Sequence, residues 1–248
     1  SKQAGYIGSL AVCNVPESSL VRESEVALMT RAGPEIGVAS TKAFTTQLVA
    51  LRLMTLALAR RRGLTSEQET EWVEELQALP RQVEVVLKLS DAIEEMAQSF
   101  ADKQNALFLG RGTFYPIAME GALKLKEISY IHADAYPAGE LKHGPIALID
   151  PDMPTIAIAC KDGQEGKIKS NLREVLARGG EVFLFADERL DLSDLGESCH
   201  VMPLPAVEAE LAPVLYVLPL QLFSYFVAVH KGTDVDQPRN LAKSVTVE

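Results

Sequence analysis

The hydrophobic positions of this 248-residue chain alternate between short continuous apolar runs and the i, i+3, i+4 spacing of amphipathic helices. Continuous runs bounded by turn residues are typical of strands buried on both faces of a parallel sheet. They predict a strand at Ile7–Val15, which we expect to be buried on both faces, and further strands at Val26–Thr30, Ala106–Leu109, Thr155–Cys160, Glu181–Ala186 and Cys199–Met202. The helical spacing predicts helices at Ser18–Glu23, from a cap at Ser40 or Thr41 to Arg62, and at Ser66–Leu89, Ser90–Phe100, Phe114–His132, Glu165–Arg178 and Glu208–His230.

The order of these elements determines the expected fold class. Strands that alternate with long helices form parallel βαβ units, which predicts an α/β fold with helices on both faces of a parallel sheet. The pattern restarts near residue 103, so we expect two such units with a helical connector between them. Open sheets of this kind bind ligands at the carboxyl ends of the strands, where the strand order reverses. We therefore expect sites in Gly110–Thr113, in Gly33–Ser40 and after Ile131.

Composition narrows the possible functions. The net charge of −10 disfavours binding to nucleic acid and to anionic membranes, because no basic surface would offset their phosphates. The longest apolar stretch, Val214–Val229, is interrupted by Pro219 and is short for a membrane span, so it predicts a buried core helix. The three cysteines, Cys13, Cys160 and Cys199, contain no CxxC motif, and we expect them to be buried thiols in a reducing cytosol.

One predicted helix carries a stripe of charged residues. Glu120, Lys124 and Glu127 recur at i, i+4 and i+7, so they share one face of the helix that starts at Phe114. One interpretation is an exposed salt-bridge ladder that contributes little to stability. The other is that Glu127 acts as a general base that Lys124 keeps ionised. The spacing alone does not distinguish the two interpretations.

The histidines offer one further candidate. His143 stands in a predicted loop beside a lysine, where an imidazole can move a proton near neutral pH, although such a position is also typical of a solvated surface. His132, His200 and His230 have no acidic or cysteine partner at metal-ligand spacing, so we expect no metal site.

The last thirteen residues, 236–248, form an unusual tail. They end in apolar and β-branched residues rather than in the charged, glycine-rich or serine-rich composition of a solvated tail. This composition predicts that the tail, with its single lysine, Lys243, folds back into a site. In the alternative interpretation Lys243 reaches solvent and only anchors the tail.

Three segments together resemble one enzyme family: GVASTKAFTTQL (Gly37–Leu48), MEGALKLKEISYIHADAYPAGELKHGP (Met119–Pro145) and DQPRNLAKSVTVE (Asp236–Glu248). They resemble the glucosamine-6-phosphate synthases, which are isomerizing glutamine–fructose-6-phosphate aminotransferases, and the resemblance extends over essentially the whole chain. It implies two sugar-isomerase (SIS) domains of flavodoxin-like, three-layer αβα fold, the first truncated at its N-terminus. The implied domains are residues 1–65 as the C-terminal part of the first SIS domain, 66–102 as a helical connector, 103–235 as the second SIS domain and 236–248 as an active-site tail.

The resemblance also implies a role for individual residues. Glu127 would move a proton between C1 and C2 of the sugar, with Lys124 as its companion in the site. His143 would open the sugar ring in the neighbouring subunit of a homodimer, and Lys243 would react with the sugar carbonyl. The residues that would line the sugar pocket are Val38, Ala39, Ser40 and Ala242.

The implied reaction converts fructose 6-phosphate and glutamine-derived ammonia into glucosamine 6-phosphate in the cytoplasm, without a metal or an organic cofactor. Members of the family also have a glutaminase domain that supplies the ammonia and a Ser/Thr-rich loop that binds the phosphate. Neither segment occurs in this sequence, so we expect the chain alone to bind sugar phosphates weakly. Two other functions stay open, namely another SIS-fold isomerase or deaminase of sugar phosphates and a non-catalytic sugar-phosphate sensor. The presence of Glu127, His143 and Lys243 favours an enzyme.

Overall fold

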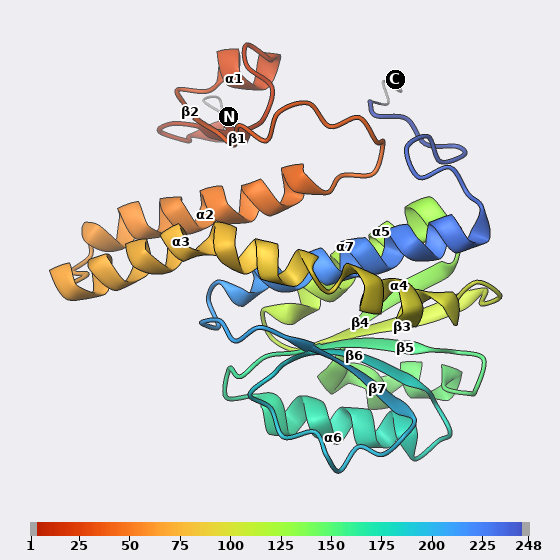
Figure 1. The fold of residues 1–248 in the computed structure, drawn as a ribbon. Helices are drawn as coiled ribbons and strands as arrows, with labels where there is room; N and C mark the ends of the chain where they lie inside the picture. The colour runs from red at the N-terminus through yellow and green to blue at the C-terminus, as the bar shows by residue number, and fades with distance from the viewer. Residues whose placement is uncertain (1–3, 245–248) are drawn as a thin grey trace. The chain divides into compact units, whose positions relative to one another are not determined.

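The computed structural model describes residues 4–244. The chain forms two compact units, residues 1–74 and 75–248, and each is described by itself. Figure 1 shows the course of the chain through both.

The first unit contains a pair of parallel strands, β1 (Leu10–Cys13) and β2 (Val26–Met29), with Leu10 opposite Val26. Both predicted strands are confirmed, but the expected burial of the first on both faces is wrong. Ala11 is buried, whereas Leu10 is 49% exposed. The reason is that the described part of this unit pairs two strands only, too few to bury both faces of either. The helices of this unit are α1 (Ser19–Glu23), α2 (Lys42–Arg60) and the first part of α3 (Ser66–Leu87).

A carboxylate caps the N-terminus of α2. Oε1 of Glu35 accepts hydrogen bonds from the backbone N–H groups of Thr41 (2.8 Å) and Ala43 (3.2 Å). Thr41 is the N-cap residue, which confirms one of the two expected positions, but its side chain makes no capping bond, and the hydroxyls of Ser40 and Thr41 donate to Glu35 instead. The first-turn N–H groups of a helix lack backbone partners and favour a negative charge, which explains why a carboxylate occupies this position.

The second unit contains a parallel sheet that confirms the predicted fold class. Its strands lie in the order β4-β3-β5-β6-β7, so the order reverses between β3 and β5. The carboxyl ends of β3 and β5 therefore flank the position at which such sheets bind ligands. The strands are β3 (Asn105–Gly110), β4 (His132–Pro137), β5 (Thr155–Ala159), β6 (Val182–Asp187) and β7 (Cys199–Leu204).

Helices cover both faces of this sheet and complete the predicted three-layer αβα arrangement. Figure 1 shows α4, α5 and α7 over one face and α6 over the other. On the first face, Phe100 packs edge-on against Phe183 and Phe223, with ring centroids 4.7 Å apart in each pair. The remaining elements are α4 (Ser90–Gln98), α5 (Phe114–Ser129), α6 (Glu165–Leu176), α7 (Ala212–Lys231) and the 3-10 helices η2 (Ala138–His143) and η3 (Pro145–Leu148).

The apolar pattern does not predict strand β4, and it predicts too long a helix before it. Helix α5 ends at Ser129 rather than at His132, and Tyr130 follows in the left-handed backbone conformation (φ 63°). This conformation costs a residue other than glycine about 1–3 kcal/mol, so the surrounding contacts must hold it. Strand β4 escapes prediction because it is an edge strand of mostly half-buried residues and lacks a continuous apolar run.

Helix α7 confirms the predicted core helix. Among the described residues it is the one helix that is long and apolar enough to cross a membrane, but 61% of its most apolar window is buried inside the protein. Phe223 is fully buried, and α7 packs against α4 and α5. Its hydrophobicity is therefore explained by its place in the core.

The cysteines occupy two kinds of environment. Cys160 and Cys199 are buried as predicted, and burial raises the pKa of their thiols to about 12 and about 11. Cys13 is partly exposed at the end of β1, so its predicted burial is wrong. A hydrogen bond with the Ser18 hydroxyl lowers the pKa of the Cys13 thiol.

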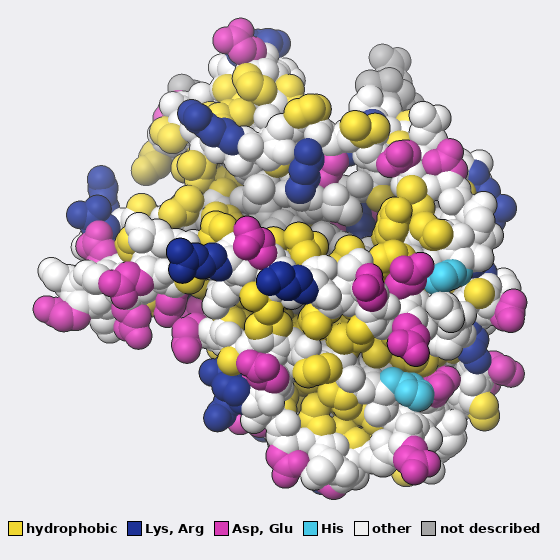
Figure 2. Space-filling model, in the orientation of Figure 1, with side chains coloured by type: hydrophobic (Ala, Val, Ile, Leu, Met, Phe, Trp, Pro, Cys, Tyr) yellow, Lys and Arg dark blue, Asp and Glu magenta, His cyan; other side chains and the backbone are white. Residues whose placement is uncertain are grey.

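The surface carries charges of both signs. On the face drawn in Figure 2, acidic side chains lie among basic ones. A mixed surface of this kind differs from the continuous basic surface that proteins present to nucleic acid.

Candidate active site

Helix α5 brings two carboxylates and one ammonium together inside the protein. Nζ of Lys124 lies 2.5 Å from Oε2 of Glu127 and 3.6 Å from Oε1 of Glu120. The Lys124 side chain is 3% exposed and that of Glu120 is 9% exposed. Lysine is rarely buried without a partner, because its ammonium loses its hydration. The two carboxylates compensate for this loss.

Glu127 is the member of this cluster that a ligand can reach. Its side chain remains 21% exposed, whereas Glu120 and Lys124 are enclosed. One oxygen of Glu127 is held by Lys124, which fixes the orientation of the carboxylate. A carboxylate that is anchored on one side and accessible to ligand is a candidate general base.

The interpretation of this stripe as an exposed salt-bridge ladder is wrong, since two of its three members are buried. Helix α5 is covered on two sides. A Cβ atom at Gly121 would lie 2.8 Å from Leu220 of α7 and 2.9 Å from Phe108 of β3. Glycine lets the three elements approach closely at this point of the helix.

His143 is exposed, but the residues that precede it are held in place. It ends η2, its side chain is 75% exposed, and Nε2 lies 3.9 Å from the carboxylate of Glu140. The residues before it are held in place, because Leu141 is fully buried and Lys142 forms an ion pair with Glu174 of α6 (2.9 Å). Among the described residues, no recorded hydrogen bond or ion pair joins His143 to the α5 cluster.

The other predicted site residues lie in two places. Val38, Ala39 and Ser40 precede α2 in the first unit, where Ala39 is buried and its two neighbours are half-buried. They belong to the first unit, and their part in a sugar pocket stays a prediction. Ala242 and Lys243 lie in the tail of the second unit, and both are exposed.

The tail contacts the end of α5. The backbone N–H of Arg239 donates a hydrogen bond to the hydroxyl of Tyr130 (2.9 Å), a residue 109 positions earlier in the chain. The sequence pattern does not indicate Tyr130, because neither its left-handed backbone nor this long-range contact leaves a periodic signal. Closure of the tail over a ligand stays a prediction.

The profile of the SIS domain matches residues 2–57 and 99–231. The chain belongs to the SIS domain family. Its fold agrees with that of a solved SIS protein, the C-terminal domain of glucosamine-fructose-6-phosphate aminotransferase from Francisella tularensis. The TM-score is 0.91 at 54% identity, over 96% of this chain and 67% of that one.

Curated relatives of this chain are named as aminotransferases of the same kind. It is 62% identical over 249 residues to the glutamine–fructose-6-phosphate aminotransferase (isomerizing) of Pseudomonas putida and 60% identical over 248 residues to that of Escherichia coli K12. All of this chain is covered, but it spans 41% of the length of each relative. A glucosamine-6-phosphate deaminase from Thermotoga maritima is 23% identical with a TM-score of 0.71, which shows a shared fold alone.

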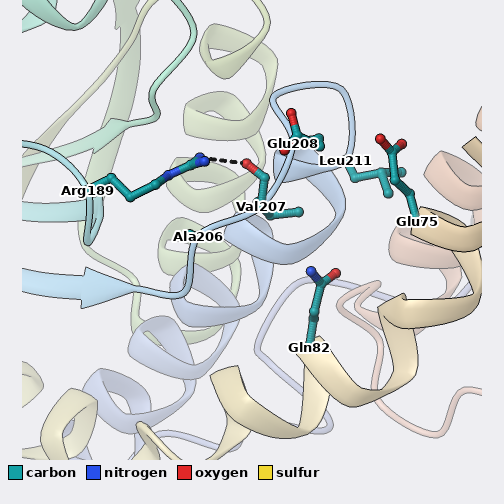
Figure 3. A pocket seen from close by; sticks show the side chains of 7 residues that line it. All are labelled: Glu75, Gln82, Arg189, Ala206, Val207, Glu208 and Leu211. Atoms are coloured by element: carbon teal, nitrogen blue, oxygen red, sulfur yellow. Dashed lines mark hydrogen bonds between the residues drawn. The ribbon is translucent and has the colours of Figure 1, made fainter. Parts of the chain in front are cut away.

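The carboxyl edge of the second-unit SIS sheet carries two pockets, and Arg189 lines both. One has a volume of about 320 Å³ and lies between α6 and the loop after β6. The other, of about 230 Å³, lies between α3 and the segment after β7 (Figure 3). The residues that line the second pocket are Glu75, Gln82, Arg189, Ala206, Val207, Glu208 and Leu211.

Arg189 ties together the carboxyl ends of two strands. Its guanidinium donates to both oxygens of Asp187, at the end of β6, and to the carbonyl of Val207, after β7 (2.8 Å; Figure 3). The Asp187 side chain is fully buried. Burial disfavours its ionised form, but the N–H groups of Arg189 outweigh this effect and hold the pKa of the Asp187 carboxyl below its usual range. We interpret this pair as structural.

We predict that Arg189→Met lowers the free energy of unfolding by about 3–5 kcal/mol at pH 7, because it leaves the Asp187 carboxylate buried without its partner. Urea denaturation of the two proteins measures the difference. The double variant Asp187→Asn with Arg189→Met is the control, and it should recover part of the loss because neither charge remains.

The pH dependence provides a second check of the same pair. A carboxyl whose folded-state pKa is lowered contributes stability above its unfolded-state pKa, and this contribution is lost as pH falls through the folded-state value. The difference between the parent and Arg189→Met should therefore shrink in acid. A difference that is equal at neutral and acidic pH would contradict the predicted role of Asp187.

Proposed function

We propose that this chain is the sugar-isomerising region of a glutamine–fructose-6-phosphate aminotransferase. Such an enzyme makes glucosamine 6-phosphate from fructose 6-phosphate and ammonia derived from glutamine. The observation that carries the proposal is the buried Lys124 between Glu120 and an accessible Glu127, in a chain 60–62% identical to enzymes of that name. Because the chain spans 41% of those relatives, the glutaminase domain that would supply the ammonia is itself part of the proposal.

The reaction requires a base that moves one proton. When ammonia has formed an imine at C2, with release of the carbonyl oxygen as water, a base removes a proton from C1 and returns it to C2. The product then carries an amino group at C2 and an aldehyde at C1. Glu127 suits this task, because one of its oxygens is anchored by Lys124 and the side chain stays partly open to a ligand. This chemistry needs no metal and no organic cofactor.

Lys243 supplies an amine that can capture the open-chain sugar. Its nitrogen forms a C=N bond at C2 with release of water, and ammonia then replaces the lysine nitrogen in the same position. The contact between the tail and the end of α5 supports this role, because that helix carries Glu127.

A homodimer gives His143 a function in the proposed reaction. Its side chain is exposed, and the segment before it is fixed against α6, so it is suited to act in the site of a neighbouring subunit. There it would open the sugar ring by moving the ring proton near neutral pH.

The remaining parts of the proposal concern the sugar pocket and the domains. Val38, Ala39 and Ser40 of the first unit and Ala242 of the tail would line the pocket. We further propose the domain boundaries 1–65, 66–102, 103–235 and 236–248, and a cytoplasmic location.

We predict that borohydride traps fructose 6-phosphate on Lys243 in the complete synthase that contains this chain. Reduction of the imine makes the bond permanent, and mass spectrometry of the C-terminal peptide detects the added sugar. Lys243→Arg should abolish both trapping and amino-sugar formation, because a guanidinium is not a nucleophile near neutral pH. Lys126→Arg, at an exposed lysine of α5 paired with Asp134, is the matched control and should leave both unchanged.

Glutamine hydrolysis should survive the Lys243→Arg change, since the glutaminase reaction occurs in another domain. If Lys243→Arg makes glucosamine 6-phosphate at close to the parental rate, Lys243 only anchors the tail.

We also predict that two inactive variants restore each other. His143→Ala and Glu127→Gln should each be inactive as homodimers. After subunit exchange, an equal mixture should regain about a quarter of the parental activity, because half of the dimers are mixed and each mixed dimer has one intact site. Steady-state production of glucosamine 6-phosphate measures the recovery. A mixture that stays inactive after demonstrated exchange would show that His143 does not act across the interface.

A further inference from the structure

The tail meets α5 through a single aromatic residue. Tyr130 directly follows α5, and its hydroxyl accepts a hydrogen bond from the backbone N–H of Arg239 (2.9 Å). The guanidinium carbon of Arg239 also lies 4.2 Å from the centroid of the Tyr130 ring. Two different interactions, a hydrogen bond and a cation–π contact, thus join the same pair of residues.

The chain between α7 and Arg239 is shaped to reach this contact. The hydroxyl of Thr233 donates to the carbonyl of Ile128 in the last turn of α5 (2.5 Å). The carboxylate of Asp234 then accepts bonds from the backbone N–H groups of Asp236 (3.0 Å) and Gln237 (2.9 Å), which turns the chain. Two hydrogen bonds, one from Thr233 and one from Arg239, therefore attach this part of the chain to the end of α5.

The backbone of Tyr130 indicates that its side chain is required there. Its φ of 63° is a conformation that helix ends usually give to glycine. If the position served only to end the helix, glycine would do so without strain. The aromatic side chain instead makes the two contacts with Arg239.

The positions of the two residues relate this contact to the reaction. Tyr130 lies three residues after Glu127, and Arg239 lies four residues before Lys243. Four residues of extended chain span at most about 14 Å, so fixing Arg239 restricts the tail lysine to the neighbourhood of the end of α5. The short chain between Arg239 and Lys243 therefore limits the Lys243 side chain to this region.

We propose that Tyr130 and Arg239 form a clamp that positions Lys243 for its reaction with the sugar carbonyl. This proposal rests on the proposed function, specifically on the role of Lys243. Both residues act through the tail and are positioning residues. The clamp holds the tail beside α5, the helix that bears Glu127. The amine of Lys243 and the carboxylate of Glu127 can then contact the same sugar molecule.

The test compares Tyr130→Gly and Arg239→Ala with the parent in the complete synthase. Glycine fits the left-handed backbone, so Tyr130→Gly keeps the helix end and removes the clamp. We expect the rate of borohydride trapping on Lys243 and kcat for amino-sugar formation to fall about 10- to 100-fold in both variants, because a reacting group that is misplaced by an ångström loses rate on this scale. Tyr130→Phe keeps the ring contact and loses the hydrogen bond, so its loss should be smaller.

A comparison of kcat with KM separates positioning from a structural role. If Tyr130 acts through Lys243, Tyr130→Gly should lower kcat and the trapping rate while KM for fructose 6-phosphate changes by less than about twofold, because the clamp orients the amine and does not bind the sugar. Parental trapping in Tyr130→Gly, or a loss that lies in KM rather than in kcat, would overturn the clamp. A parental rate in Lys243→Arg alone would instead refute the proposed function, so the two failures are distinguishable.

Discussion

The buried ammonium of Lys124 is the interaction on which the second unit depends. A lysine that is 3% exposed must be compensated, and Glu120 and Glu127 provide the compensation from the same helix. On the same helix, Gly121 lets α5 approach both β3 and α7 closely. One carboxylate is enclosed with the lysine and the other keeps access to ligand. Glu120 and Glu127 are thus the same kind of side chain with different exposure to solvent. This difference is the basis of the catalytic role that we propose for Glu127.

Helix α5 also connects the other parts of the candidate site. It begins after β3, beside the point where the strand order reverses, and carries Glu127 toward its C-terminal end. Tyr130 then turns the chain into β4, which leads to η2 and His143. The tail with Lys243 returns to the same helix end through Arg239. Glu127 and the tail, which are far apart in the sequence, are thus joined to one helix, and a displacement of that helix would affect both.

The sequence predicts the parts of this structure that have a regular pattern. The continuous apolar runs reveal β3, β5, β6 and β7, and the 3.6-residue period reveals α5 with its charged stripe. The same period cannot show that Lys124 is buried, since burial depends on how neighbouring elements pack over the helix. The helical period also gives no indication that Glu35 caps α2, because a cap that comes from a preceding loop depends on the path of that loop. Tyr130 is missed because its left-handed backbone reflects a contact with the tail.

The most direct measurement of the central claim follows the proton that Glu127 would move. Because the Glu127 side chain is 21% exposed, a proton that it takes from C1 can exchange with solvent before it reaches C2, so during turnover of fructose 6-phosphate in deuterated water the complete synthase should incorporate solvent deuterium at C2 of part of the product. Glu127→Gln should abolish this incorporation, and Lys124→Met should slow it by about 100-fold or more, the scale of general acid–base catalysis. Lys126→Met, at the exposed lysine nearby, should leave it unchanged. Incorporation at the parental rate in folded Lys124→Met or Glu127→Gln would contradict the claim that the buried pair forms the catalytic base.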